Sequence, residues 1–174
     1  MSTYATRQLL LEIARRDSGK VEVTKNRAPW IAKLWPATTY PDGMDNREPY
    51  CAAGVAYCVR EWLKLPEVLK AFGMTAGQAE KWRCKSPVAF DWLAWAKKAK
   101  GVTVLPDAVV LHAGDLVIYT YSHIEIVTDD DGTKDGPFVA IGHNTNAAGS
   151  ADGEGCFEKP RSRKSVKAFV RMLA

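Results

Sequence analysis

Two cysteines stand close together in the stretch Tyr50–Val59, YCAAGVAYCV, of a chain that has only four cysteines. Cys51 falls at the expected start of a helix, where unpaired backbone N–H groups stabilise a thiolate. Cys58 lies about two turns further along, so the two backbones are too far apart for a disulfide. The chain has no C-x-x-C pair, which argues against a structural zinc site. Cys51 is therefore either a nucleophile or a small buried cysteine, and its position alone leaves both open.

The other three cysteines are expected to be unreactive. Cys58 lies in the middle of the predicted helix and should pack in the core. Cys84 and Cys156 lie in segments without regular periodicity, and we interpret both as structural or incidental.

A cysteine nucleophile needs a base and a group that orients the base. Of the three histidines, His112 precedes a turn and is expected at the surface, whereas His123 opens the apolar run IEIV and should lie at the start of a strand. A cysteine on a helix, a histidine on one strand and an asparagine on the next resemble the Cys-His-Asn sites of papain-like enzymes. We therefore predict Cys51 as nucleophile, His123 as base and Asn144 as the orienting residue. His143 is the less favoured orienting residue.

Helical periodicity dominates the first half of the chain, up to Gly101. It predicts helices over residues 3–18, 28–35, 51–65 and 87–99. We expect Ser2 or Thr3 to cap the first helix and Ser86 to cap the last. Pro36 and Pro66 should end the second and third.

Short β-rich runs follow Gly101, separated by turn residues. They predict strands over residues 116–120, 124–128, 138–141 and 166–173, the first two forming a hairpin. The order predicts an α+β fold in which N-terminal helices pack on one side of a small antiparallel sheet. Residues 1–174 show no internal repeat or domain boundary, so one domain is expected.

The composition indicates a globular protein. Hydrophobic residues make up 47% of the 174 residues and charged residues 25%. The chain contains no run of eighteen apolar residues, so we expect no segment that spans a membrane. The N-terminus lacks the pattern of a signal peptide. We expect synthesis in the cytoplasm. The net charge of +4 would favour anionic partners such as cell-wall polymers or nucleic acid, although most such charge is a solvated face.

Four motifs, in order, carry a resemblance to a known family: PYCAAGVAYC, AGDLVIY, YSHIEIV and AIGHNTNAAGS. Together they resemble the CHAP amidohydrolases and peptidases, a group within the NlpC-type and papain-like cysteine hydrolases. Each motif alone is weak, but four in order across residues 26–160 are specific. The resemblance implies a papain-like/NlpC-like core and cleavage of amide bonds in peptidoglycan. The segment GHNTNAAGSADGEG resembles phage-encoded members in particular.

The resemblance implies the same three roles, with Cys51 matching the nucleophile, His123 the base and Asn144 the asparagine of the family's E-G-N-T motif. The chain also departs from the family. Gly142 stands at the position of the family's glutamate and His143 at that of its glycine. The carboxylate of many members is therefore missing from this position.

Two further positions are open. Tyr50 stands where the family has tryptophan or glutamine, so we assign no side chain as donor to the oxyanion. Glu125 follows His123 by two residues and should share its face of the strand. It would either tune the histidine or contact solvent, and we favour solvent.

No cofactor is expected. The loops PDGMDN and TDDDGTKDG resemble calcium loops in composition, and some relatives bind calcium before the cysteine. Neither loop has the alternating oxygen spacing of an EF-hand, and turn chemistry explains both more simply.

The leading prediction is a peptidoglycan hydrolase, either an N-acetylmuramoyl-L-alanine amidase or a stem or cross-bridge endopeptidase. The resemblance implies a phage or prophage endolysin that a holin or another delivery system brings to the cell wall. We expect a monomer that binds peptidoglycan and neither inserts into a membrane nor binds nucleic acid. Three alternatives stay open: a secreted antibacterial amidase effector, a cysteine hydrolase of another amide, and a non-catalytic binding module. In the last, a basic surface with six tryptophans holds glycan or nucleic acid while Cys51 is inert.

Overall fold

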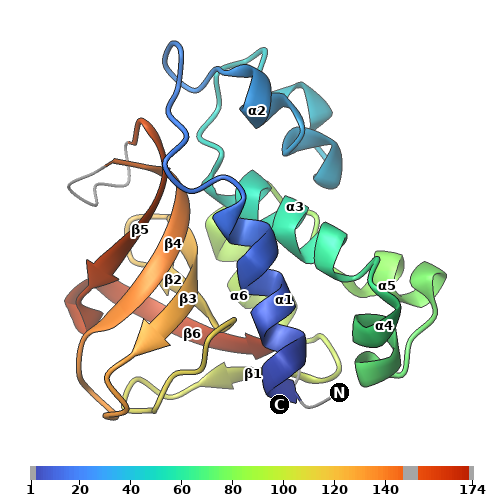
Figure 1. The fold of residues 1–174 in the computed structure, drawn as a ribbon, viewed down its shortest axis with the longest axis vertical. Helices are drawn as coiled ribbons and strands as arrows, with labels where there is room; N and C mark the ends of the chain where they lie inside the picture. The colour runs from blue at the N-terminus through green and yellow to red at the C-terminus, as the bar shows by residue number, and fades with distance from the viewer. Residues whose placement is uncertain (1–2, 147–152, 173–174) are drawn as a thin grey trace.

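The computed structural model describes residues 3–146 and 153–172, which form helices first and an antiparallel sheet second (Figure 1). The helices are α1 (Thr3–Arg15), α2 (Pro29–Ala32), α3 (Cys51–Trp62), α4 (Pro66–Phe72), α5 (Ala76–Trp82) and α6 (Ala89–Ala96). The strands are β1 (Val102–Leu105), β2 (Leu116–Tyr119), β3 (Ile124–Asp130), β4 (Phe138–Thr145), β5 (Gly155–Arg161) and β6 (Val166–Met172). This confirms the predicted α+β class.

The strands form one sheet in the order β1-β6-β2-β3-β4-β5, and every neighbouring pair is antiparallel. Strand β6 lies between β1 and β2, so it connects β1 to the predicted hairpin of β2 and β3. The pairing of β3 with β4 brings the start of β3 beside the end of β4. His123 and Asn144 therefore come from neighbouring strands at the same end of the sheet.

The helices cover one face of the sheet, as Figure 1 shows, and the main core lies between them. Inward-facing side chains of β3 and β4, such as Ile124, Ile126 and Ile141, meet the apolar side of α3 there. Their spacing of two follows the pleat of a strand. The other face closes over a smaller cluster that includes Val117, Val127 and Phe169. Because side chains pack on both faces of the sheet, the ends of its strands are held in place.

Helix α3 packs closely on the sheet because small residues face it. Ala52 and Ala56 are fully buried in the core between the helix and the sheet. At Gly54 a Cβ atom would lie 2.2 Å from the ring of His143 on β4, so only glycine fits. The close approach places the first residue of the helix, Cys51, beside the end of β3.

Helices α2 and α3 do end before Pro36 and Pro66, but at Ala32 and Trp62, earlier than predicted. Pro36 lies inside a 3₁₀ turn, Trp35–Ala37, that follows α2, and Pro66 begins α4 instead of only ending the helix before it. Proline lacks the N–H that the first turn of a helix leaves unpaired, so it begins a helix as readily as it ends one.

The predicted cap at Ser86 is wrong. Helix α6 begins at Ala89 and its N-cap is Val88, without a side-chain cap. The Ser86 hydroxyl instead accepts from the Val88 N–H at 3.1 Å and donates to Asp91 at 2.6 Å, so it shapes the turn before the helix. Of the two caps predicted for the first helix, Ser2 lies outside the described residues.

Four elements were not predicted: α4, α5, β1 and β5. The strands β1 and β5 are the edges of the sheet. Edge strands need less apolar sequence, and β5 carries Lys159, Pro160 and Arg161, which are typical of such edges. Helix α5 is short and starts with a capping box between Thr75 and Gln78.

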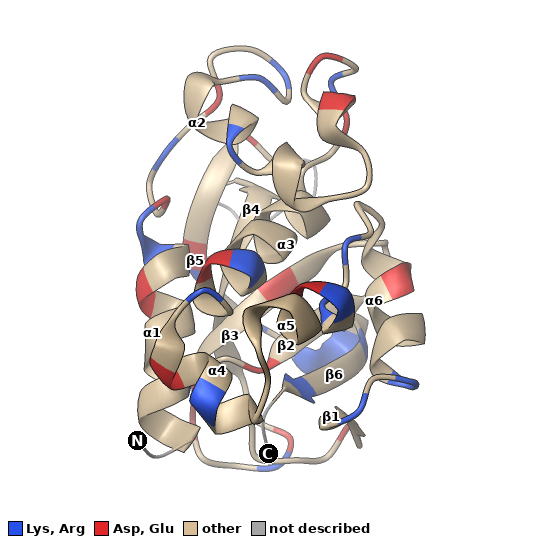
Figure 2. Ribbon diagram, turned by 90° about the vertical axis from the view of Figure 1, so that its right-hand side faces the viewer, with Lys and Arg blue, Asp and Glu red and all other residues tan. Residues whose placement is uncertain are grey.

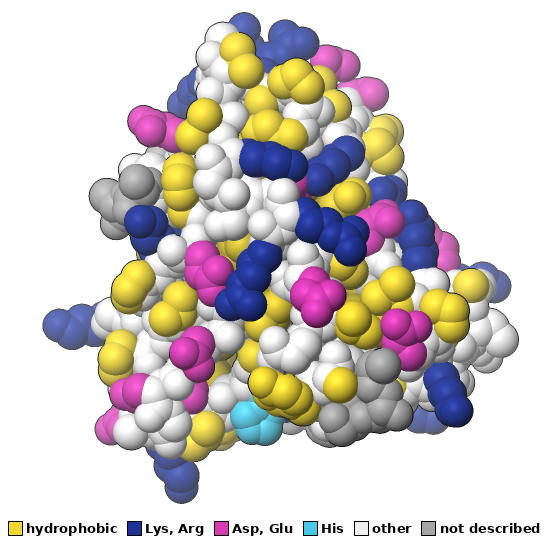
Figure 3. Space-filling view, in the orientation of Figure 1, with side chains coloured by type: hydrophobic (Ala, Val, Ile, Leu, Met, Phe, Trp, Pro, Cys, Tyr) yellow, Lys and Arg dark blue, Asp and Glu magenta, His cyan; other side chains and the backbone are white. Residues whose placement is uncertain are grey.

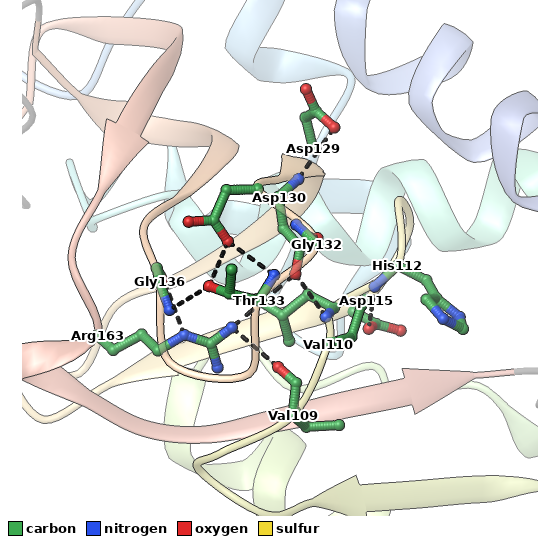
Figure 4. A network of polar contacts seen from close by, with 12 residues as sticks. Val109, Val110, His112, Asp115, Asp129, Asp130, Gly132, Thr133, Gly136 and Arg163 are labelled. Carbon is green, nitrogen blue, oxygen red and sulfur yellow. Dashed lines mark hydrogen bonds and ion pairs between the residues drawn. The ribbon is translucent and has the colours of Figure 1, made fainter.

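The acidic loop after β3 is held by its own side chains, as Figure 4 shows. Asp130 Oδ1 accepts from the N–H of Gly132 at 2.9 Å, and Thr133 Oγ1 accepts from the N–H of Gly136 at 3.0 Å. Arg163 Nε donates to the Gly136 carbonyl at 2.8 Å. Asp130 thus takes part in a turn of the kind expected for this loop.

Basic side chains form a band across the face shown in Figure 3, and acidic side chains lie among them (Figures 2 and 3). Lys33 pairs with Asp17 at 2.6 Å and Arg60 with Glu61 at 3.0 Å. Both cations also lie over the Tyr57 ring, at 4.8 and 5.5 Å. These cations are therefore paired within the fold. No helix among residues 3–146 and 153–172 is long and apolar enough to cross a bilayer.

Candidate active site

Cys51 is the first residue of α3 and lies at the bottom of a surface cleft. The side chain is 4% exposed. The first N–H groups of a helix have no partner within the helix, so they point their partial positive charge toward this end. The cleft has a volume of about 620 Å³. Its lining residues are Trp35, Tyr40, Glu48, Pro49, Cys51, Pro87, Val88, Ala89, Tyr121, Ser122, His123 and Asn144.

His123 lies in the same cleft, directly before β3, and is almost fully buried. Ser122 adopts a left-handed conformation with φ of 57°, which turns the chain from β2 into β3. The ring atom Nε2 lies 3.1 Å from Oε1 of Glu125. A carboxylate only accepts hydrogen bonds, so this contact assigns the proton to Nε2. The other ring nitrogen, Nδ1, is then free to take a proton from a nucleophile.

Cys51 lines the cleft beside His123, and its interaction with the ring raises the pKa of the histidine. Nδ1 has no hydrogen-bond partner among the described residues. Burial lowers the pKa of His123, but hydrogen bonding and charge from Cys51 and Glu125 outweigh it and raise the pKa to about 9. A raised histidine pKa beside a cysteine favours the thiolate–imidazolium pair, the reactive form of a cysteine nucleophile.

Glu125 is fully buried on β3, so the expectation that it contacts solvent is wrong. Burial raises the pKa of its carboxyl group, but hydrogen bonds and charge from His123 and Arg161 lower the pKa below the usual value. Arg161 of β5 donates to both carboxylate oxygens, one of them from Nε at 2.8 Å. The Tyr119 hydroxyl donates to Oε2 at 2.6 Å. This network keeps Glu125 ionised and fixes its orientation toward His123.

Glu125 lies against Gly142, the position at which the resemblance led us to expect a carboxylate that this chain lacks. Ile126 pairs with Ile141, so Glu125 stands directly opposite Gly142 across the β3–β4 ladder. A Cβ at Gly142 would lie 2.2 Å from Glu125 Oε1 and 2.7 Å from its carboxyl carbon. The glycine therefore leaves the room that a carboxylate from the neighbouring strand fills.

Asn144 lines the cleft together with Cys51 and His123. The acceptor at Nε2 of His123 is Glu125, so the structure does not place Asn144 in the predicted orienting position. Asn144 has a left-handed backbone with φ of 56°, at an irregularity in the β4–β5 ladder. Asparagine tolerates this conformation better than most residues. The irregular backbone changes the alternation of the strand at the point where β4 meets the cleft.

His143 is not part of the cleft. Its ring packs against Gly54 of α3, and its Nε2 lies 3.5 Å from Oδ2 of the buried Asp17. Lys20 and Lys33 donate to the same carboxylate at 2.7 and 2.6 Å. His143 thus faces the helices, whereas Glu125 faces the other side of the sheet. His112 is exposed, as predicted.

All four cysteines are free, as expected. Cys51 is the only one of them that lines the cleft. Burial raises the pKa of Cys58, of Cys156 and, to about 11, of Cys84. These three thiols are poor nucleophiles because the thiolate is costly in the core.

Sequence reasoning thus missed Glu125 as the partner of the histidine. The available signal was its spacing of two from His123 on a strand, which places the two side chains on one face. Among residues 3–146 and 153–172, no three His, Cys, Asp or Glu side chains gather in a way that could hold a metal ion.

Comparison with known proteins yields only a distant likeness. No protein-family model and no curated protein sequence matches the chain. One similar solved structure is the crystal structure of a wild-type endolysin, LysIME-EF1, with 23% sequence identity and a TM-score of 0.34. The matching part covers 42% of this chain and 38% of the endolysin chain. The chain therefore spans well under half the length of that protein, and a likeness of this size does not establish a family.

Proposed function

We propose that the chain is a cysteine-dependent amide hydrolase with a papain-like/NlpC-like arrangement of its site. One observation carries the proposal. Cys51 and His123 interact at the bottom of an open cleft, and a buried carboxylate holds the second nitrogen of the histidine. Nucleophile, base and orienting group are the three parts that such a reaction needs.

The proposed reaction uses the protonation states that the contacts favour. Nδ1 of His123 takes the proton of Cys51, and the thiolate attacks the carbonyl carbon of the amide. The tetrahedral intermediate collapses, His123 gives its proton to the leaving amine, and an acyl-enzyme thioester remains. Water, deprotonated by His123, then releases the acid and restores the thiol. Glu125 orients the ring and stabilises its positive charge through both steps.

The negative oxygen of the intermediate needs hydrogen-bond donors. The backbone N–H groups at the start of α3 are available because a helix leaves its first N–H groups unpaired. We assign the second donor to the side-chain amide of Asn144, which lines the cleft with Cys51. This role replaces the orienting role predicted for it.

The proposed substrate is bacterial peptidoglycan, and the support for it is the resemblance of the four motifs to CHAP amidohydrolases and peptidases. On this proposal the chain acts at the cell wall as an endolysin or as an antibacterial effector.

Digestion of purified peptidoglycan, followed by mass spectrometry, tests the proposal. We expect new amino termini, an intact glycan backbone and no activity in Cys51→Ala. Release of peptides that begin with the first stem residue would identify an amidase, and cuts within the peptide would identify an endopeptidase. New reducing sugar ends, or full activity in Cys51→Ala, would contradict the proposal.

A further inference from the structure

We propose that Glu48 makes the cleft selective for substrates that carry a protonated amine near the amide that Cys51 attacks. For wall peptides this inference rests on the proposed function. The selectivity itself is a property of the cleft.

Among the residues that the structure describes, Glu48 is the single acidic one in the lining of the cleft, and no Lys or Arg lines it. It lies three residues before Cys51, and its backbone N–H donates to the Gly43 carbonyl at 2.9 Å. Pro49 follows and restricts the backbone between Glu48 and the helix. The position of Glu48 relative to the nucleophile is therefore set by the chain.

The charge of Glu48 is not used within the fold. Its side chain is exposed and has no ion pair or hydrogen bond with another described residue. The neighbouring cation, Arg47, lines a separate hollow with Arg27. Glu125, which contacts His123 of the cleft, is already paired with Arg161. Glu48 is thus a charge of the cleft that a substrate can pair with.

The walls of the cleft favour the same kind of ligand. Tyr40 is 38% exposed and Tyr121 45% exposed, and both line the cleft. Tyr121 is held flat by stacking on Tyr119, with ring centroids 5.1 Å apart and an angle of 12°. Aromatic faces attract cations and pack on aliphatic chains. A carboxylate beside two exposed tyrosines fits an alkylammonium group.

Wall peptides carry such a group. They contain a diamino acid whose side-chain amine is protonated in an uncross-linked stem and becomes a neutral amide when it is cross-linked. The cleft is therefore expected to prefer stems with a free amine over cross-linked stems. The shared chemistry is an alkylammonium group near a peptide bond.

Thiol labelling tests the charge of the cleft without any wall substrate. Two methanethiosulfonates are compared, the cationic 2-aminoethyl and the anionic 2-sulfonatoethyl reagent. The thiolate of Cys51 attacks the sulfenyl sulfur, forms a mixed disulfide and expels methanesulfinate. We expect the ratio of cation to anion rates to fall about three- to tenfold in Glu48→Gln, because one charge near the thiolate is lost.

The matched control is Glu12→Gln, since Glu12 is an exposed glutamate on α1 that does not line the cleft. Its ratio should equal that of the wild type. Labelling of Cys51→Ala reports any reaction at the other cysteines. An unchanged ratio in Glu48→Gln would overturn the inference.

A second measurement uses wall peptides with a free or an N-acetylated side-chain amine. We expect the wild type to prefer the free amine through KM, and Glu48→Gln to lose the preference with kcat little changed. Equal cleavage of both peptides by the wild type would also overturn the inference. If neither peptide is cleaved, the proposed function fails while the labelling ratio still decides the role of Glu48.

Discussion

At the scale of single residues, reactivity in this chain depends on where a side chain lies. Cys51 and Cys58 share one helix and one residue type. Cys51 lies at the start of the helix, in a cleft and beside His123, whereas Cys58 is enclosed by the core and burial raises the pKa of its thiol. The two cysteines should therefore respond to substitution in opposite ways.

We expect Cys51→Ala to abolish turnover and leave the fold intact. Cys58→Ala should keep activity but lower the free energy of unfolding by about 1–2 kcal/mol, because it removes buried sulfur from a packed core. Peptidoglycan digestion and urea denaturation measure the two effects. Activity lost in Cys58→Ala and kept in Cys51→Ala would show that the wrong cysteine was assigned.

The roles assigned to Glu125 and Asn144 differ in what they do to His123. Glu125→Gln removes the charge that stabilises the imidazolium and should lower kcat/KM about ten- to a hundredfold. Asn144→Ala removes a donor and should lower kcat about a hundred- to a thousandfold without changing the pH profile. His123→Ala should abolish turnover, and His143→Ala should lower stability more than activity. A normal rate in Glu125→Gln beside a shifted pH profile in Asn144→Ala would reverse the two roles.

The pH dependence follows from the pKa of His123, which is raised to about 9. We expect kcat/KM to fall on the alkaline side near pH 9, where the imidazolium loses its proton. In Glu125→Gln the limb should move to lower pH, since Glu125 is one of the two groups that raise the pKa. The raised pKa of His123 also stabilises the fold. This contribution to the free energy of unfolding is fully present below pH 6.5 and is lost as the pH rises through about 9. If Glu125→Gln leaves the alkaline limb of the pH profile unchanged, this would contradict the hydrogen bond between His123 and Glu125.

At the scale of elements, the pairing of β3 with β4 brings the parts of the site together. Gly142 on β4 leaves the space into which Glu125 of β3 extends. The ladder positions this contact because it sets Glu125 opposite Gly142. Substituting alanine for Gly142 therefore tests both the position of the Glu125 carboxylate and the register of β3 against β4.

We expect Gly142→Ala to displace the Glu125 carboxylate and to lower kcat/KM at least tenfold, with an alkaline limb that moves to lower pH as in Glu125→Gln. The added Cβ would lie 2.2 Å from Oε1, so the carboxylate has to move. Gly77→Ala is the control, because a Cβ at Gly77 on α5 meets no atom within 4 Å. Equal activity of both variants would mean that Glu125 keeps its contact in another way.

At the scale of the whole molecule, one buried carboxylate joins parts of the chain that are far apart in sequence. Asp17, just after α1, binds Lys20, Lys33 and His143 of β4. Burial raises the pKa of Asp17, but hydrogen bonds from these three groups outweigh it and hold the pKa below its usual value. The cluster ties the N-terminal helix to the sheet behind the cleft.

We expect Asp17→Asn to lower the free energy of unfolding by about 2–3 kcal/mol near neutral pH, because it removes the buried charge that Lys20, Lys33 and the buried His143 contact. The stabilisation should be fully present above the ordinary pKa of 3.8 and be lost as the pH falls further. Urea denaturation at several pH values measures it, with the exposed ion pair variant Asp45→Asn as control. If the difference in unfolding free energy between the wild type and Asp17→Asn stays constant down to pH 2, this would contradict the ionised state of Asp17.

Local sequence patterns already specify the secondary structure class, the core helix and three residues of the cleft, Cys51, His123 and Asn144. Periodicity of 3.6 before Gly101 and of two after it reflects the faces that must be buried, so the α+β class and most elements follow from local pattern. The same holds for Cys51 and His123. A helix start and a strand start are local features, and both lie where they were predicted.

Only the tertiary structure decided which polar groups meet. Glu125 was expected in solvent and Asn144 on the histidine, and the outcome depended on the register of β3 against β4 and on Arg161 from β5. Such contacts join residues far apart in the sequence, by 36 positions for Glu125 and Arg161 and by 126 for Asp17 and His143. Their energies depend on burial and on charge partners from other strands, which no local pattern records.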